Sequence, residues 1–105
     1  MILKFKCLPE EDKPRERLVL YGSEVLSNEE LLMIILKTGT KKCSVKEVAN
    51  NLLVSIGGID KLRDVTINNL IRIDGIGKVK AIELLAVIEL ARRINAPVKE
   101  MDVLS

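Results

Sequence analysis

The sequence of 105 residues is poor in aromatic side chains, which make up 2% of it. It has no tryptophan, and its aromatic residues are Phe5 and Tyr21. Proteins that bind single-stranded nucleic acids usually stack the bases on aromatic side chains, so base stacking is not expected to carry recognition here. The core must be built from aliphatic side chains, and with only three prolines and six glycines this composition favours a small all-α domain over a β-sandwich or a barrel.

Histidine is absent, and the two cysteines, Cys7 and Cys43, lie far apart in the sequence. Zinc sites and redox motifs use closely spaced cysteine or histidine ligands, so we expect two reduced structural thiols and neither a metal nor a cofactor. Asp60, Asp64 and Asp74 are scattered among basic residues and do not form the carboxylate cluster of a two-metal nuclease. No nucleophile has a plausible base beside it, so the sequence predicts no catalytic residues and no enzyme activity.

Long apolar runs are also missing. No apolar stretch approaches the roughly 20 residues that a membrane span requires. The N-terminus lacks the apolar core of a signal peptide, and a cytoplasmic protein without a membrane partner is predicted. The length fits one domain. We expect a flexible leader over residues 1–12, a helical domain over 13–95, and a linker over 96–105 leading toward a further, absent domain.

Two helix starts are marked by the same sequence pattern. Ser27-Asn28-Glu29-Glu30 and Ser44-Val45-Lys46-Glu47 both fit the capping box, in which a serine and a glutamate satisfy each other's unpaired backbone donors. Helices should therefore begin near residues 28 and 45. The first is interrupted by Thr38-Gly39-Thr40 and the second is stopped by Gly57-Gly58. These two helices make one helical hairpin.

Further helical segments flank this hairpin. A short helix begins at Asp12 or Lys13, tolerates Pro14 in its first turn and ends at Gly22. A helical turn is expected over 59–63, and Thr66 is a plausible N-cap for a helix over 67–73.

The last predicted helix runs from about residue 78 to 94 and ends before Pro97. It is apolar nearly all round, which predicts that it is the central helix of the domain. Its packing is expected to join two sets of side chains, Leu70 and Ile73 before the turn and Val79, Ile82, Leu85 and Ala86 after it.

The turn before this last helix, Gly75-Ile76-Gly77, is the most informative motif of the chain. A helix start has unpaired backbone N–H groups and a partial positive charge, both of which suit an anion. Glycines let a phosphate approach the backbone, and an apolar residue between them anchors the turn in the core. The expected phosphate site comprises the backbone of Gly75, Gly77 and Val79, the anchor Ile76, and the ammonium groups of Lys78 and Lys80.

A weaker copy of this pattern lies in the first hairpin. Residues 36–42, laid over residues 73–79, repeat the order of helix, small-residue turn, lysine and helix, but with one glycine and a longer turn. Two such turns on one face would grip a duplex through its phosphates without reading its sequence. The expected second contact comprises Thr38, Gly39, Thr40, Lys41 and Lys42. The alternative is that Gly-Ile-Gly is only a tight corner between two helices.

Basic residues are concentrated around the two hairpins. Residues 1–36 hold five basic and seven acidic side chains, whereas residues 37–93 hold eleven basic and six acidic ones. The net charge of +2 is too small to indicate nucleic-acid binding by itself, but its distribution supports it. Asp74 is a departure from this trend, because its carboxylate directly precedes the turn. There it would either cap or brace the turn or oppose a phosphate.

An ordered series of motifs resembles the N-terminal region of bacterial RadC-like proteins. The series consists of Pro14-Arg15-Glu16-Arg17-Leu18, Tyr21-Gly22, residues 26–32, Thr38-Gly39-Thr40, Ser44-Val45, Gly57-Gly58, residues 73–77 and Lys80-Ala81. The resemblance covers residues 8–95 and implies a double helix-hairpin-helix domain of the SAM-like class, historically tied to DNA repair. In that family the domain precedes a C-terminal JAB/MPN-type domain, to which any metal-dependent hydrolase activity would belong.

Two functions remain open at this point. The first is a non-catalytic module that binds the phosphate backbone of duplex or branched DNA without sequence preference. The second is a protein-interaction module or a homodimerisation module, which the very apolar last helix favours because such a surface needs to be covered.

Overall fold

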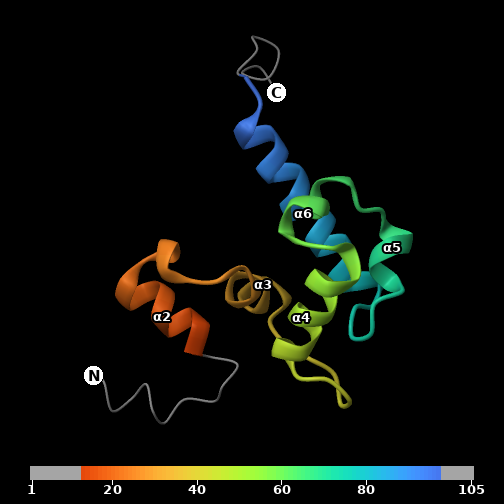
Figure 1. Ribbon diagram of the computed structural model, residues 1–105, viewed down its shortest axis with the longest axis horizontal. Helices are drawn as coiled ribbons and strands as arrows, with labels where there is room; N and C mark the ends of the chain where they lie inside the picture. Colours follow the sequence, from red (N-terminus) through yellow and green to blue (C-terminus); the bar gives the residue numbers. More distant parts are fainter. Residues whose placement is uncertain (1–12, 98–105) are drawn as a thin grey trace.

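The computed structural model describes residues 13–97, and all regular structure in this part of the chain is helical (Figure 1). The predicted leader over 1–12 and all but the first two residues of the predicted linker lie outside the described residues. The predicted all-α fold is confirmed. Its elements are α2 (Lys13–Tyr21), η2 (Ser23–Val25), α3 (Asn28–Leu36), α4 (Val45–Ile56), η3 (Ile59–Asp64), α5 (Ile67–Ile71) and α6 (Lys78–Asn95), where η denotes a 3-10 helix.

Reciprocal capping boxes begin three of these helices. In each box the side chain of the N-cap residue accepts a hydrogen bond from a backbone N–H three residues on, and that residue's side chain accepts one in return. The pairs are Ser27 with Glu30, Ser44 with Glu47, and Thr66 with Asn69. An N-cap of this kind contributes about 1 kcal/mol to helix stability. The helix starts predicted near 28, 45 and 67 are therefore confirmed.

The helices pair as two hairpins joined by η3. α3 packs against α4, α5 packs against α6, and η3 contacts both α4 and α6. The largest fully buried side chains come from both hairpins and form one core: Leu36, Val45, Val48, Leu52, Leu70 and Leu84. Two helical hairpins joined by a short connector are the arrangement expected of a double helix-hairpin-helix domain.

The packing of α6 differs from the prediction. Val79 and Ile82, expected in the core, are 70% and 51% exposed, and Ala86 is also exposed. The buried residues of this helix are instead Ala81 and Leu84. Because α6 is apolar nearly all round, its periodicity could not indicate which face turns inward.

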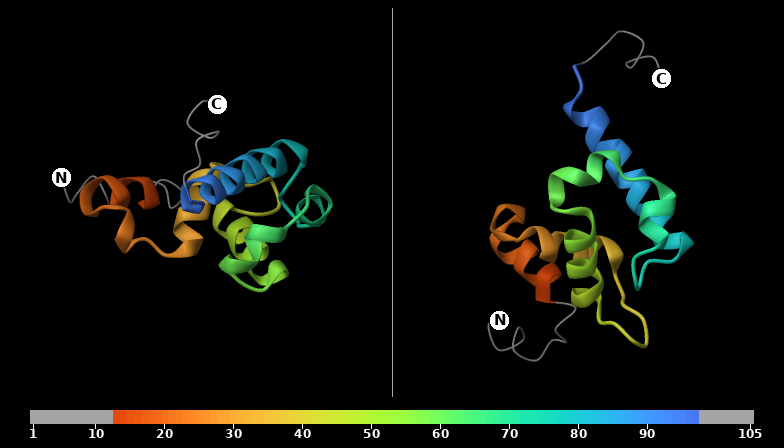
Figure 2. Two further views of the ribbon diagram at one scale, coloured as in Figure 1. Left: turned by 90° about the horizontal axis from the view of Figure 1, so that it is seen from above. Right: turned by 45° about the vertical axis from the view of Figure 1, so that its right-hand side comes forward.

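The position of α6 is also less central than predicted. It packs against α5, α3 and η3, and its C-terminal end projects beyond the rest of the bundle (Figures 1 and 2). Leu90 and Ile94, toward this end, are 60% and 79% exposed. α6 is therefore central to the bundle except at its C-terminal end.

The helix α2 lies at one side of the bundle and is attached through α3 (Figure 1). Pro14 lies in the first turn of α2, as the sequence predicts, and it is buried. The Arg17 guanidinium donates to the backbone oxygen of Val25 and lies 3.0 Å from a carboxylate oxygen of Glu30. Because Glu30 also caps α3, one carboxylate both begins α3 and holds α2 against it.

Candidate nucleic-acid interface

The second hairpin turns through Ile73–Ile76. The backbone N–H of Ile76 donates to the carbonyl oxygen of Ile73 at 3.0 Å, and Gly75 has a φ of 96°, a conformation that favours glycine. A Cβ atom on Gly75 would lie 2.4 Å from Cγ2 of Val48 on α4. Gly75 is therefore required both by its backbone conformation and by close packing between the hairpins. Ile76 is buried, which confirms the predicted anchor.

Gly77, the other glycine of the motif, is in a different situation. It is the N-cap of α6 with a φ of −87°, an ordinary value for any residue. A Cβ atom at this position would meet no atom within 4 Å. Neither backbone conformation nor packing within residues 13–97 therefore requires glycine at position 77. Its effect is to leave open space directly in front of the helix start.

The start of α6 carries unpaired backbone donors. The first intrahelical hydrogen bond is donated by Ala81 to Gly77 at 3.0 Å, which leaves the amides of Lys78, Val79 and Lys80 without an intrahelical acceptor. No side chain of the described residues caps this end, and the first turn contains no acidic residue. Of the helices α3 to α6, this is the one with the start that suits an anion best.

The lysines beside this helix start have different roles. Lys78 is exposed, and none of the described residues forms a hydrogen bond or an ion pair with its side chain. The Nζ atom of Lys80 instead donates to the carbonyl oxygen of Leu36 at 3.0 Å and to Oγ1 of Thr38 at 3.3 Å. Lys78 is thus available to an incoming phosphate, whereas Lys80 joins α6 to the end of α3.

The turn of the first hairpin satisfies its own backbone. Oγ1 of Thr40 accepts hydrogen bonds from the backbone N–H groups of Lys42 and Cys43, and the N–H of Thr40 donates to the oxygen of Cys43 at 2.7 Å. A Cβ atom on Gly39 would lie 2.2 Å from that same oxygen. The glycine of this turn is therefore used for close backbone packing, and the turn has few donors left for a phosphate.

The first turn does present positive charge to the solvent. Lys41 and Lys42 are exposed, and no partner for either ammonium group is found within residues 13–97. The helix behind them, α4, begins with the Ser44 and Glu47 capping box, which places a carboxylate where an anion would otherwise bind. Any contact of this turn with DNA would therefore be made by the lysine side chains.

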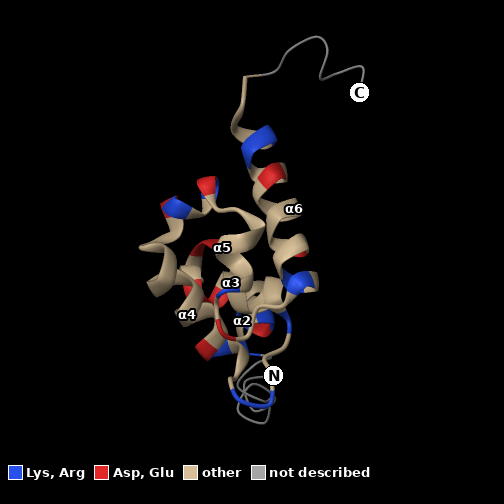
Figure 3. Cartoon of the chain, turned by 90° about the vertical axis from the view of Figure 1, so that its right-hand side faces the viewer, with Lys and Arg blue, Asp and Glu red and all other residues tan. Residues whose placement is uncertain are grey.

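The structure brings the two turns to the same end of the molecule (Figures 1 and 2). Lys80 bridges to Leu36 and Thr38, and Nζ of Lys37 lies 3.3 Å from a carboxylate oxygen of Glu83. α6 carries basic segments near both of its ends and acidic segments between them (Figure 3). Asp74 is exposed next to the open helix start, as the sequence indicates.

The bridging contacts were not predicted from the sequence. Lys80 and Leu36 are 44 residues apart, and Lys37 and Glu83 are 46 apart. Every residue has a backbone oxygen that can accept a hydrogen bond. The identity of Leu36 therefore gives no indication that it is the partner of Lys80. The opposite charges of Lys37 and Glu83 are compatible with pairing but do not indicate it.

No group of three or more histidine, cysteine, aspartate or glutamate side chains that could hold a metal ion occurs within residues 13–97. Among the helices described, none is both long enough and apolar enough to cross a membrane.

Comparison with known proteins identifies relatives of this chain. A family model described as UPF0758 N-terminal matches residues 5–82. A UPF0758 protein from Clostridium botulinum strain Hall is 48% identical over 90 residues, which cover 86% of this chain and 40% of the relative. A UPF0758 protein from Bacillus licheniformis is 47% identical over 94 residues, which cover 90% of this chain and 42% of the relative. No solved structure matches.

These matches confirm the resemblance noted in the sequence. The chain spans about 40% of the length of the relatives it matches, and the matching model is that of an N-terminal part. The motifs shared with RadC-like proteins and the two helical hairpins agree with this placement. The chain therefore belongs to the RadC-like UPF0758 family, of which it represents the N-terminal domain.

Proposed function

We propose that this domain binds the phosphate backbone of DNA, without sequence preference and without catalysis of its own. The uncapped start of α6, with Gly77 in front of it, is the observation that supports this function most directly. A phosphate there would accept hydrogen bonds from the amides of Lys78, Val79 and Lys80, and the Lys78 ammonium would add an ionic contact. DNA repair stays an expectation drawn from the RadC resemblance.

The first turn would make a second, weaker contact through Lys41 and Lys42. Since both turns lie at one end of the molecule, two phosphate groups of one duplex could be contacted together. Binding of this type releases counterions. For each phosphate contacted, the logarithm of the binding constant therefore falls by about 0.9 for a tenfold increase in salt concentration. With two or three contacts, the slope of log K against log salt concentration is expected to be about −2 to −3.

The experiment that tests this function is fluorescence anisotropy of labelled duplex, forked and single-stranded DNA at several salt concentrations. Lys78→Glu should weaken binding to every sequence by a similar factor, about fivefold or more at low salt. Lys61→Glu makes the same change of charge at an exposed position of η3 and serves as the control. A change of sequence preference in Lys78→Glu, or equal losses in both variants, would contradict the proposal.

A protein-interaction function has its own supporting observation. Several large apolar side chains on the outer face of α6 are exposed, among them Val79, Leu90 and Ile94. Large apolar side chains exposed together on a helix are typical of a face that meets another protein. The two functions are compatible, because Leu90 and Ile94 lie near the far end of α6 and only Val79 lies at its start.

A further inference from the structure

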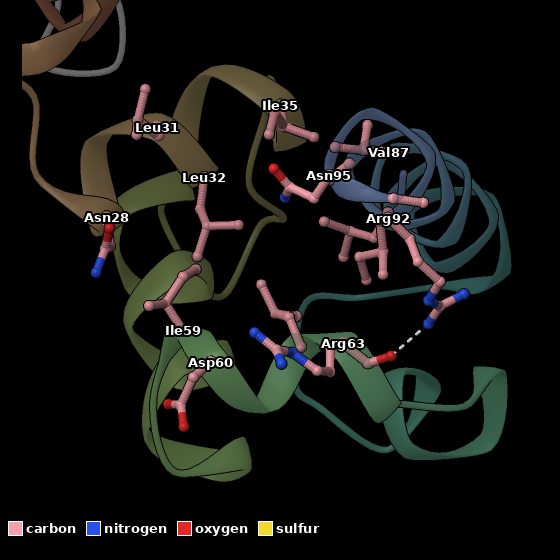
Figure 4. Close-up of a pocket in the computed structure, with 15 residues that line it drawn as sticks. Asn28, Leu31, Leu32, Ile35, Ile59, Asp60, Arg63, Val87, Arg92 and Asn95 are labelled. Atoms are coloured by element: carbon pink, nitrogen blue, oxygen red, sulfur yellow. Dashed lines mark hydrogen bonds between the residues drawn. The ribbon is translucent and has the colours of Figure 1, made fainter. Parts of the chain in front are cut away.

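An apolar groove lies between α3, η3 and the second half of α6 (Figure 4). Its volume is 610 Å³, and Ile59 and Val87 on its opposite walls are 41% and 39% exposed. Further apolar side chains of its walls include Leu32, Ile35, Leu62, Leu84, Ile88 and Ala91. A concave apolar surface of this kind is suited to receive an apolar helix or loop of another polypeptide segment.

Contacts at one end of the groove hold its walls together. A guanidinium nitrogen of Arg92 on α6 donates to the backbone oxygen of Arg63 on η3 (Figure 4). The Glu89 carboxylate accepts hydrogen bonds from Arg93 and from Arg92, and these two guanidinium groups lower the pKa of Glu89 below its ordinary value of 4.5. Arg92 is thus oriented on α6 while it contacts η3, so the groove does not depend on apolar contacts alone.

The comparison with relatives indicates what would fill this groove. The N-terminal family model ends at residue 82, whereas the groove is formed by α6 from residue 84 onward. The chain covers 40% and 42% of two longer relatives, and because the matching family model is N-terminal, most of each relative follows the matched region. Asn95 and Ala96, where the backbone leaves α6, themselves line the groove. A segment that follows would begin at the groove, and tethering would give it a high effective concentration there.

We propose that this groove is the docking surface for the polypeptide that follows the N-terminal domain in the longer family members. The occupant would be an apolar segment of that C-terminal portion, and α6 would be shared between the two parts. This inference is independent of the proposed DNA binding, because the groove lies on the half of α6 farthest from Gly77.

The test compares this chain with a chimera. In the chimera, residues 1–96 are followed by the part of the Bacillus licheniformis relative beyond its matched region. Hydrogen exchange is measured for the amides of residues 59–64 and 84–95 in both proteins. We expect exchange at least tenfold slower in the chimera. Equal exchange in the two proteins would overturn the proposal, and this comparison requires no substitution.

Two variants sharpen the result. Val87→Glu places a charge in the groove and should return exchange in the chimera to the rates of the chain alone. Leu90→Glu makes the same kind of change on the same helix at a position that does not line the groove, and it should keep the protection. Equal effects of the two variants would overturn the proposal. The melting of each variant in the chain alone checks that it folds.

Two further measurements separate this proposal from its alternatives. Sedimentation of the chain alone should give a monomer, and a dimer whose groove amides become protected as concentration rises would identify a second copy as the occupant and overturn the proposal. The anisotropy assay should show unchanged DNA affinity for Val87→Glu. Loss of DNA binding in this variant would contradict the independence of the groove from the phosphate site.

Discussion

The two hairpin turns of this domain have similar sequences but use their backbone groups differently. In the first turn, Oγ1 of Thr40 accepts hydrogen bonds from two backbone N–H groups, and Gly39 packs against the oxygen of Cys43. In the second turn, Gly75 packs against Val48, whereas Gly77 faces open space before a helix that no described side chain caps. A glycine in a turn can therefore serve packing in one case and access to the backbone in another.

Because of this difference, the two turns are expected to contribute unequally to phosphate binding. Donors that are already bonded within the fold are not available to a ligand, whereas the first three amides of α6 are. The first turn can contribute the charges of Lys41 and Lys42, and the second can contribute both charge and directed hydrogen bonds. The expected hierarchy of contacts can be tested by changes that affect one turn and spare the other.

The largest expected effect comes from Gly75→Ala. The new Cβ would lie 2.4 Å from Val48, and φ at this position is 96°. Overpacking and backbone strain together should lower the free energy of unfolding by about 3 kcal/mol, as measured by urea denaturation. Gly77→Ala is the matched control and should lower it by about 1 kcal/mol or less, because the site is open and the variant loses only the N-cap preference of glycine over alanine. Similar losses in both variants would remove the distinction between the two glycines.

Gly77→Asp should affect binding without harming the fold. Aspartate is at least as good an N-cap as glycine, so the melting temperature should stay equal or rise. Its carboxylate would occupy the place of the phosphate, and DNA affinity in the anisotropy assay should fall at least tenfold. Gly77→Ala, which adds no charge, should bind more tightly than Gly77→Asp. Wild-type affinity in the aspartate variant would exclude the start of α6 as the phosphate site.

Replacing both lysines of the first turn sharpens the comparison between the hairpins. Lys41→Glu with Lys42→Glu should reduce the salt dependence of DNA binding by about one or two units of slope. The loss of affinity per charge should be smaller than in Lys78→Glu, since these ammonium groups lack neighbouring unpaired amides. A larger loss per charge would make the first turn the principal contact.

Lys80→Met tests the contact between the hairpins. The substitution keeps an apolar side chain of similar length but removes the donor to Leu36 and Thr38. Since the oxygen of Leu36 still accepts from the N–H of Thr38, we expect a loss of about 1 kcal/mol in the free energy of unfolding. Urea denaturation measures it. If DNA affinity fell as much as in Lys78→Glu while stability was unchanged, Lys80 would be a phosphate contact instead.

The smallest expected effect concerns Glu89, far from both turns. Arg93 and Arg92 lower its pKa in the folded state, so its carboxylate contributes stability above the unfolded pKa, and this contribution is lost as the pH falls through the lower folded pKa. In Glu89→Gln, the free energy of unfolding should therefore decline slightly less steeply with falling pH below 4.5, which is the ordinary pKa of a glutamate. Urea denaturation between about pH 3 and pH 6 measures this change. An unchanged decline would indicate that the ion pairs are fully screened.

Much of the fold was predictable because its signals are local. A capping box occupies four consecutive residues, and Gly57 ends α4 in the left-handed conformation that glycine favours, so the boundaries of α3 and α4 follow from the sequence directly. The inward face of α6 was not predictable, because apolar residues surround that helix. Burial of Ala81 and Leu84 in place of Val79 and Ile82 is decided by packing against the other hairpin.

The candidate site was predictable in outline only. The motif Gly75-Ile76-Gly77 predicts a turn with a buried anchor. The sequence does not distinguish the two glycines, although Gly75 packs against Val48 and Gly77 faces open space. In the same way, two lysines in the first turn of α6 look equivalent until the fold brings Lys80 to the end of α3. Such distinctions depend on contacts between residues far apart in the sequence.

The bare start of α6 also links ligand binding to the melting of the domain. Under the proposed function, a DNA phosphate would complete this helix in the way that Ser27 completes α3. A ligand that binds only the folded state stabilises it by about 2.7 kcal/mol when its concentration is 100 times its dissociation constant. The folded domain would then be most stable when it is bound to DNA, because the phosphate would serve as the N-cap that no side chain of α6 provides.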